Sequence, residues 1–355
     1  MVYTEYDPLE EVIVANSYLP GDLDHLFPDK SLSSFNKILD ETKQDFDNLA
    51  NFLIQGGVTV TRPEVLKYPD HISMSGFEVK FPMGPTVPRD QYKLHGNTII
   101  QTYTSLTDRY FDGLSYYKIF SDLFEQGYNW ISQPPPPLIN VNPADIWYVS
   151  GQIYHTRLKD RLLFHTATMF SVGDKIIINS QGPGNALGYE WIKRNLSEYE
   201  FIENTNCRAE NYGHIDHGFI MIDDETVIHA GIDWVPRALR HLKLIDVEQY
   251  VPQPNTAQYK QDYISAGGRY NLAWIDQYLD NWRGYNQDVC FDLNVLIIDR
   301  HNIIFGRELP ELFQYLKTFG IECHVCEQRH MLFWEGGIHC STLDTKRRGN
   351  CRTII

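Results

Sequence analysis

Cys340 lies in a sequence context that is typical of a catalytic nucleophile. It follows Gly336-Gly337-Ile338-His339 and precedes Ser341-Thr342, shortly before the basic run Lys346-Arg347-Arg348. Glycines let the backbone pass close to a substrate, because no side chain obstructs the approach. A thiolate attacks electrophilic carbon when a neighbouring group activates it. The sequence therefore predicts a nucleophile at Cys340, and the structural alternative is a small buried hydrophobe.

The composition limits the class of protein. The chain has 355 residues, of which 43% are hydrophobic and 22% charged, a mixture typical of a globular protein with a sizeable core. A net charge of −15 argues against nucleic-acid and anionic-membrane partners, which need clustered lysine and arginine. The chain start resembles no secretory leader, no apolar run approaches a membrane helix, and six cysteines are too few for a disulfide scaffold. We expect a soluble cytoplasmic enzyme.

Short strands that could position such a site recur along the chain. Apolar segments predict strands at 11–14, 97–100, 175–178, 218–222 and 294–298, and amphipathic segments predict helices at 35–55, 189–196 and 308–319. Segments 218–228 and 294–304 repeat one plan of strand, acidic turn and strand. Hairpin units that recur at roughly 70 residues indicate radial repetition rather than one doubly wound sheet. No clear linker interrupts the chain, so we expect a single domain over residues 1–355.

Six short motifs occur in an order that makes them informative together. They are Glu5–Val14, Pro88-Arg89-Asp90, Leu187–Arg194, His214-Ile215-Asp216, Gly336–Cys340 and Arg347-Arg348-Gly349. With these motifs the chain resembles the glycine amidinotransferase family of the guanidino-modifying (pentein) superfamily. The resemblance implies an α/β fold, a five-bladed α/β propeller of ββαβ modules with the active site at its central axis. It also implies a homodimer.

The resemblance implies transfer of an amidino group from an arginine-like guanidino donor to a primary amine. A guanidinium carbon is a poor electrophile because three nitrogens share its positive charge. Cys340 is expected to attack it and to carry the amidino group, while Asp90 and Asp216 bind the planar cation. His214 is expected to protonate the leaving amine and then to deprotonate the incoming one. The alternatives are a guanidine-group hydrolase and a relative that only binds cationic metabolites; no cofactor or metal is implied.

The chain departs from the family beside its expected catalytic histidine. The family has a Phe-Asp-Ala-Ala-Asp segment whose first aspartate pairs with that histidine, and the aligned segment here is Phe164-His165-Thr166-Ala167-Thr168. His165 is therefore a candidate catalytic residue in place of a carboxylate. A neutral histidine can orient His214 without raising its basicity, whereas a charged one favours the thiolate and repels the substrate. The departure predicts either an altered donor or acceptor, or loss of the ancestral reaction.

A second departure concerns the carboxylate of the substrate. The family binds it partly through an arginine after the His-x-Asp hairpin and partly through a small polar residue before a later strand. Asp233 stands at the first place, with Arg237 close enough to serve after a small loop shift, and Asp292 stands at the second. Two acids repel a carboxylate and suit an ammonium, as in a diamine, polyamine or agmatine-like substrate. The alternative is that both acids are solvated loop residues.

Two further patterns carry little weight. Cys323-His324-Val325-Cys326 has the spacing of half a zinc site, but the chain has no second cysteine pair at finger-like spacing, and segment 320–326 predicts a strand. Gln181–Gly188 predicts a turn that opens a helix rather than a phosphate loop, because it lacks the P-loop lysine. We expect Asp223-Asp224-Glu225 to be a solvated hairpin tip and Pro134–Pro137 to be a rigid surface connection.

Overall fold

The computed structural model describes residues 1–26, 29–67, 72–74, 77–79, 82–103, 109–136, 161–179, 186–204, 214–251, 279, 293–334 and 336–355. Within this part, five three-stranded sheets share one pattern, and β3 (Ile72–Met74) with β4 (Phe77–Val79) forms a separate hairpin. In each three-stranded sheet the first two strands pair antiparallel, and the third joins the second in parallel.

We call the five sheets blades one to five. Blade one contains β17 (Thr342–Arg347), β1 (Leu9–Val14) and β2 (Thr59–Thr61). Blade two contains β5 (Tyr92–His95), β6 (Thr98–Gln101) and β7 (Asn129–Ser132), and blade three contains β8 (Met169–Val172), β9 (Lys175–Ile178) and β10 (Glu200–Glu203). Blade four contains β11 (Phe219–Asp223), β12 (Thr226–His229) and β13 (Lys243–Asp246), and blade five contains β14 (Leu296–Asp299), β15 (Asn302–Phe305) and β16 (Glu322–Val325).

The parallel strand pair of each blade requires a crossover connection. Helices α1 (Asp29–Gln55), α2 (Gly113–Glu125), α5 (Ala186–Asn195) and α9 (Pro310–Lys317) supply it in blades one, two, three and five. Blade four uses two short 3₁₀ helices, η6 (Ile232–Trp234) and η7 (Arg237–Leu239). The predicted ββαβ modules are therefore confirmed, with a reduced helix in the fourth.

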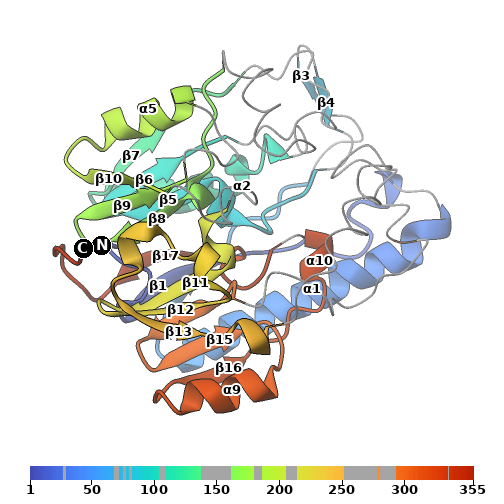
Figure 1. Ribbon diagram of the computed structural model, residues 1–355. Helices are drawn as coiled ribbons and strands as arrows, with labels where there is room; N and C mark the ends of the chain where they lie inside the picture. Colours follow the sequence, from blue (N-terminus) through green and yellow to red (C-terminus); the bar gives the residue numbers. More distant parts are fainter. Residues whose placement is uncertain are drawn as a thin grey trace.

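The two ends of the chain close the ring of blades. β17 pairs antiparallel with β1, so the termini lie side by side (Figure 1). Contacts then run from β17 to β5, from β5 to the 3₁₀ helix η4 (Thr166–Thr168), from η4 to η5 (Ile215–His217), and from β1 to β14. The predicted five-bladed α/β propeller is confirmed, and a single domain over 1–355 stays a prediction.

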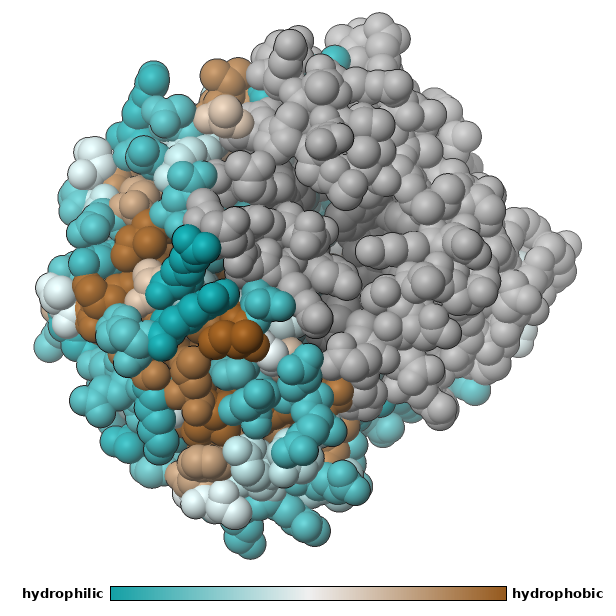
Figure 2. Space-filling view, viewed as in Figure 1, coloured by the Kyte–Doolittle hydropathy of each residue, from teal (hydrophilic) through white to brown (hydrophobic). Residues whose placement is uncertain are grey.

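Apolar periodicity explains why the predicted elements form. The strand Lys175–Ile178 has the predicted bounds, and its three isoleucines are fully buried, each contributing about 1.5–3 kcal/mol by burial. Helix α1 ends at Gly56-Gly57, where Gly57 adopts a φ of 85° that glycine tolerates without strain. Hydrophilic side chains cover much of the described surface on the face in Figure 2. Among the described helices, none is both long and apolar enough to span a membrane.

The start of each blade brings one candidate site segment to the same place. The 3₁₀ helix η2 (Pro88–Asp90) precedes β5, η4 precedes β8, and η5 precedes β11. Asn294 stands just before β14 and Cys340 just before β17. Because these starting points are equivalent in a closed ring, residues far apart in the sequence meet at one centre. The fold therefore explains why the site motifs are spread from Asp90 to Cys340.

Candidate active site

Cys340 is buried, with a relative exposure of 1%. Its backbone N–H donates a hydrogen bond to Asn294 Oδ1 at 2.9 Å, and Asn294 Nδ2 donates to Asp216 Oδ2 at 3.1 Å. A side chain at Gly336 would place its Cβ 2.7 Å from that of Cys340, and one at Gly337 would place it 2.8 Å from Asn294 Oδ1. The two glycines thus make room for the cysteine and its asparagine.

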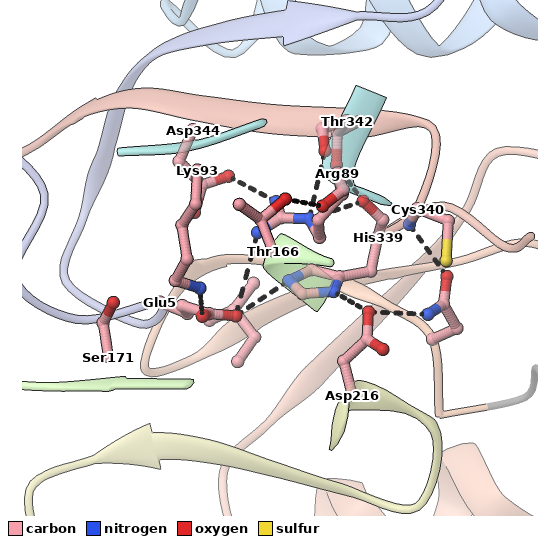
Figure 3. Close-up of polar contacts among 12 residues, drawn as sticks. Glu5, Arg89, Lys93, Thr166, Ser171, Asp216, His339, Cys340, Thr342 and Asp344 are labelled. Atoms are coloured by element: carbon pink, nitrogen blue, oxygen red, sulfur yellow. Dashed lines mark hydrogen bonds and ion pairs between the residues drawn. The ribbon is translucent and has the colours of Figure 1, made fainter. Parts of the chain in front are cut away.

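His339, which directly precedes the cysteine, bridges two buried carboxylates (Figure 3). Its Nδ1 lies 2.6 Å from Asp216 Oδ2, and its Nε2 lies 3.0 Å from Glu5 Oε2. Burial raises the pKa of Asp216, but the hydrogen bond and charge of His339 outweigh it and hold the pKa well below the usual range. His339 is therefore clamped between two acids, with each ring nitrogen facing one carboxylate oxygen.

Glu5 is anchored by further cations. Lys93 forms a close ion pair with it, and Arg89 Nη1 lies 3.8 Å from its Oε2. Burial raises the pKa of Glu5, but Lys93, His339 and Arg89 reverse that effect and hold the pKa well below its ordinary value. Because Glu5, Lys93 and His339 come from different parts of the chain, this ion network joins the beginning, the second blade and the end of the protein.

The Pro88-Arg89-Asp90 motif contains two residues with different tasks. Arg89 Nε donates to the carbonyl oxygens of His339 (2.8 Å) and Thr342 (3.1 Å), and its Nη2 pairs with Asp344 at 3.1 Å. Arg89 is buried and its guanidinium is occupied by these partners, so it fastens the segment around Cys340. Figure 3 shows it between β17 and His339.

Asp90 lies between Arg109 and His214. Its Oδ2 pairs with Arg109, which also donates to Asp112 Oδ2 at 3.0 Å and to the carbonyl oxygen of Val87 at 2.8 Å. Its Oδ1 lies 3.7 Å from His214 Nδ1 and accepts no hydrogen bond from any described residue. Burial raises the pKa of Asp90, but the charges of His214 and Arg109 lower it overall. Asp90 therefore presents an ionised oxygen to His214.

Three histidine rings gather beside these carboxylates. The His214 ring centroid lies 6.1 Å from that of His165 and 5.4 Å from that of His217. His214 is 8% exposed, and its Nε2 has no hydrogen-bond partner among the described residues. The structure thus places His165 next to His214, at the position where the alignment put it. His217, directly after Asp216, extends the group.

The cysteine is protonated at rest. Burial raises the pKa of the Cys340 thiol well above its ordinary value, and the charges of Asp216 and Asp90 raise it further. A hydrogen bond with Asn294 and the charge of Arg89 offset this only in part. A cation placed between the two carboxylates cancels their effect on the thiol. The arrangement can therefore couple thiol ionisation to the arrival of a cationic ligand.

Other predicted residues lie away from this centre. Asp233 and Arg237 are exposed in the crossover of blade four, and neither side chain takes part in the hydrogen bonds or ion pairs between described residues. Asp292 lies outside the described residues. Cys323 and Cys326 are free thiols at the strand β16 that the sequence predicted. Among the described residues, neither Asp233 nor Arg237 has a side-chain hydrogen bond or ion pair that links it to Cys340.

The acidic hairpin tip predicted at Asp223-Asp224-Glu225 is confirmed between β11 and β12, and its Asp224 also binds other segments. Asp224, predicted as part of a solvated hairpin tip, accepts hydrogen bonds from Tyr6 Oη at 2.7 Å and from Arg352 Nη2 at 2.6 Å. Arg352 also binds both carboxylate oxygens of Asp7. The acidic tip of blade four therefore fastens the two ends of the chain, because a guanidinium can serve two carboxylates at once.

Several site residues escaped the sequence analysis. Glu5 and His339 stand inside the quoted motifs, and His217 directly follows one, so their positions were a usable signal. Asn294 precedes a predicted strand, and its role depends on a contact with Cys340 across the ring. Arg109 stands in no motif, so only the fold reveals it.

Comparisons with known proteins bear on this site as a whole. No known family profile matches the chain. The chain is 24% identical over 380 residues to L-arginine:L-lysine amidinotransferase of Pseudomonas savastanoi pv. phaseolicola, covering 99% of this chain and 96% of that protein. It is 23% identical over 383 residues to mitochondrial glycine amidinotransferase of Xenopus tropicalis, covering 99% and 84%. The predicted resemblance to amidinotransferases is thus confirmed over the full length.

Solved structures agree with this relationship. An amidinotransferase of the saxitoxin biosynthetic pathway from Microseira wollei superimposes with a TM-score of 0.73 at 22% identity, covering 99% of both chains. A dimethylarginine dimethylaminohydrolase superimposes with a TM-score of 0.56 at 10% identity, covering 94% of this chain and 99% of that one. The fold is therefore shared by transferases and hydrolases of guanidino compounds.

Proposed function

Because its full-length relatives are amidinotransferases, we propose that this protein moves an amidino group from an arginine-like guanidino donor to a primary amine. The observation that carries the proposal is the meeting of Cys340, Asp90, His214 and Asp216 at the starts of three blades. A cytoplasmic location and a homodimer stay predictions.

Donor binding is the first step. Asp90 Oδ1 and Asp216 Oδ1 are buried and accept no hydrogen bond from the described residues. A guanidinium satisfies both oxygens with its planar N–H groups. Its positive charge also removes the electrostatic reason why the Cys340 thiol stays protonated. The thiolate therefore forms when the donor is in place, and His214 accepts the thiol proton.

The transfer follows in two balanced halves. Cys340 Sγ forms a bond to the guanidinium carbon, the bond from that carbon to the leaving nitrogen breaks, and His214 donates its proton to the leaving amine. The amidino group is then held as a cation on the sulfur, between the same carboxylates. His214 next removes a proton from the acceptor amine, which attacks the carbon and releases the thiolate of Cys340.

Hydrolysis is the second candidate. The fold is shared with a dimethylarginine dimethylaminohydrolase, and His214 could activate water in place of an amine. The sequence relatives named above favour transfer, because both are amidinotransferases and both align with 99% of this chain. Water as acceptor would give turnover without any added amine, so the two candidates separate in one assay.

The experiment begins with the intact mass of the protein after incubation with arginine, agmatine and other guanidino compounds. We expect a mass increase of one amidino group in the wild type and none in Cys340→Ala. Added glycine, lysine or diamines should discharge the adduct and yield new guanidino products. Discharge by water alone would favour the hydrolase. A protein that neither gains the adduct nor releases an amine with any donor would contradict both candidates.

A further inference from the structure

A group of metal-ligand atoms lies at the start of blade four. The side chains of His214, Asp216 and His217 offer two imidazoles and one carboxylate, and these ligand atoms all lie within 4.8 Å of one another. Two imidazoles with a carboxylate are typical zinc ligands, whereas magnesium and calcium prefer oxygen alone. The resemblance found in the sequence implied no metal.

Two of the three ligand atoms are available. His214 Nε2 and Asp216 Oδ1 are buried, and neither has a hydrogen-bond partner among the described residues. Their residues are 8% and 4% exposed. Buried polar atoms in folded proteins nearly always have a partner, so two such atoms at one place indicate a ligand. His217 Nε2 completes the group at 3.9 Å from Asp216 Oδ1.

Carboxylates and an amide lie around the proposed ligands. A metal-bound histidine usually directs its second ring nitrogen at a carboxylate, and His214 Nδ1 faces Asp90 Oδ1 at 3.7 Å, longer than a hydrogen bond. This leaves His214 Nε2 for the metal. His339 and Asn294 both bind Asp216 Oδ2, so the second oxygen is left free (Figure 3). Residues at the starts of blades one, two and five, namely His339, Asp90 and Asn294, thus surround the proposed ligands.

We propose that His214, Asp216 and His217 bind a zinc ion that blocks the catalytic pocket. Ligand atoms around a tetrahedral zinc stand about 3.3 Å apart, so the group must contract slightly when the ion enters. The partly exposed His217 has the most freedom to move inward. The remaining coordination position is open to water.

Zinc binding should exclude the guanidino donor. The ion takes Asp216 Oδ1, which the proposed transfer needs for the guanidinium, and His214 Nε2, which it needs for protons. Binding itself does not depend on the proposed function, and only the inhibitory consequence rests on it. A protein that binds zinc at these residues without transferring amidino groups would leave the metal proposal intact while the functional one fails.

Calorimetric titration of the metal-free protein with zinc chloride tests the site. We expect one zinc ion per chain, and His217→Gln should weaken binding by about 100-fold, since loss of even an outer-shell partner costs about 10–100-fold. His217→Asn serves as a second variant, and thermal unfolding checks that both fold. His241→Gln removes an exposed histidine elsewhere and should bind zinc as the wild type does. Binding should also survive in Cys340→Ser.

Two results would overturn the assignment. One is equal zinc affinity in His217→Gln, His217→Asn and the wild type. The other is loss of the ion in Cys323→Ser, which would move the site to the Cys-x-x-Cys segment. We expect the latter variant to keep its zinc, because residues three apart along a strand direction point to opposite faces. In the transfer assay, inhibition by zinc should weaken as the donor concentration rises, and more zinc should be needed for His217→Gln.

Discussion

The two carboxylates of the pocket are held in different ways. Asp216 belongs to a network that alternates acids and cations, through His339 to Glu5 and Lys93, and it joins residues from several blades. Asp90 is paired with Arg109, a guanidinium that is shared with a second acid, Asp112, and its other oxygen faces His214. The first network is balanced in charge and spans the ring, whereas the second is local and short of positive charge.

The pKa values reflect this difference. Glu5 and Asp216 are held ionised, because the cations around them outweigh the effect of burial. Burial raises the pKa of Asp112 from 3.8 to about 7, and Arg109 offsets this only in part. One guanidinium cannot fully stabilise two buried carboxylates. The Asp216 network therefore favours stability as well as the proposed catalysis, whereas the Asp90 network would support the proposed catalysis at a local cost in stability.

The largest expected effect is that of Asp216→Asn. The change removes a guanidinium contact and deprives His339 of one of its two anions. We expect kcat/KM for amidino transfer to fall by about 1,000-fold and the free energy of unfolding to fall by about 3–5 kcal/mol. Steady-state kinetics and urea unfolding measure the two quantities. Asp233→Asn is the matched control at an exposed acid and should change neither; unaltered stability in Asp216→Asn would break the comparison.

Asp90→Asn should damage turnover more than stability. We expect kcat/KM to fall by about 100- to 1,000-fold, because the guanidinium and His214 both lose a carboxylate. Arg109 keeps Asp112 and the Val87 carbonyl, so the free energy of unfolding should fall by only about 1–2 kcal/mol. The comparison fails if urea unfolding shows a loss as large as that of Asp216→Asn.

Much of the fold could be predicted, because local patterns of apolar residues and turns indicate its strands and repeated modules. The isoleucines of 176–178 predicted a strand with its true bounds, and the repeated hairpins predicted radial modules. Helix α1 begins at Asp29, six residues before the predicted start. Apolar periodicity did not predict this first stretch, because Leu32 is its only large apolar residue. β17 was not predicted, because Thr342–Arg347 is mostly polar and is ordered by pairing with β1.

The site was predictable only where a motif marks it. Cys340, His214, Asp90 and Asp216 stand in motifs of the resemblance, and the fold brings them to one centre. One cation that sets their charge states lies elsewhere: Arg109 reaches Asp90 from outside any motif, and its role arises from packing in blade two. Such partners depend on which elements meet in three dimensions, and local spacing in the sequence does not encode that.

Stability should depend on pH with opposite sign in the two networks. Glu5 has a pKa below its unfolded value of 4.5, so its contribution is present above that pH and is lost as pH falls through the folded pKa. Asp112 has a raised pKa of about 7, so the folded state keeps a proton that the unfolded chain releases. Its contribution is therefore lost as pH rises from about 4 to 7.

Two substitutions separate these effects in urea unfolding at a series of pH values. The free energy of unfolding of Glu5→Gln should fall least below that of the wild type in acid and most above pH 5. The ionised carboxylate of Glu5 stabilises the fold only at the higher pH. The free energy of unfolding of Asp112→Asn, relative to that of the wild type, should rise steadily between about pH 4 and 7, because asparagine has no proton to release. Parallel stability curves for both variants and the wild type would show that the two networks do not differ in this way.

The smallest expected effect is that of His165→Gln. His165 lies beside His214 with ring centroids 6.1 Å apart, and its charge lowers the pKa of Asp90 less than those of His214 and Arg109 do. A general acid or base contributes about 100- to 10,000-fold to a rate, whereas a residue that only adjusts a neighbour contributes much less. We expect kcat to fall less than about tenfold, and the acidic limb of the pH–rate profile to move to higher pH as Asp90 loses a nearby cation.

The control for this change is His165→Asp, which supplies the carboxylate that the resemblance predicts at this position. A negative charge there should raise the basicity of His214 and move the same limb further, while Asp90 keeps its pairing with Arg109. If His165→Gln instead loses as much activity as Asp90→Asn, with no shift of the pH–rate profile, His165 itself handles the protons. The local network around Asp90 would then include a second acid–base residue, and its difference from the Asp216 network would be one of chemistry as well as of charge balance.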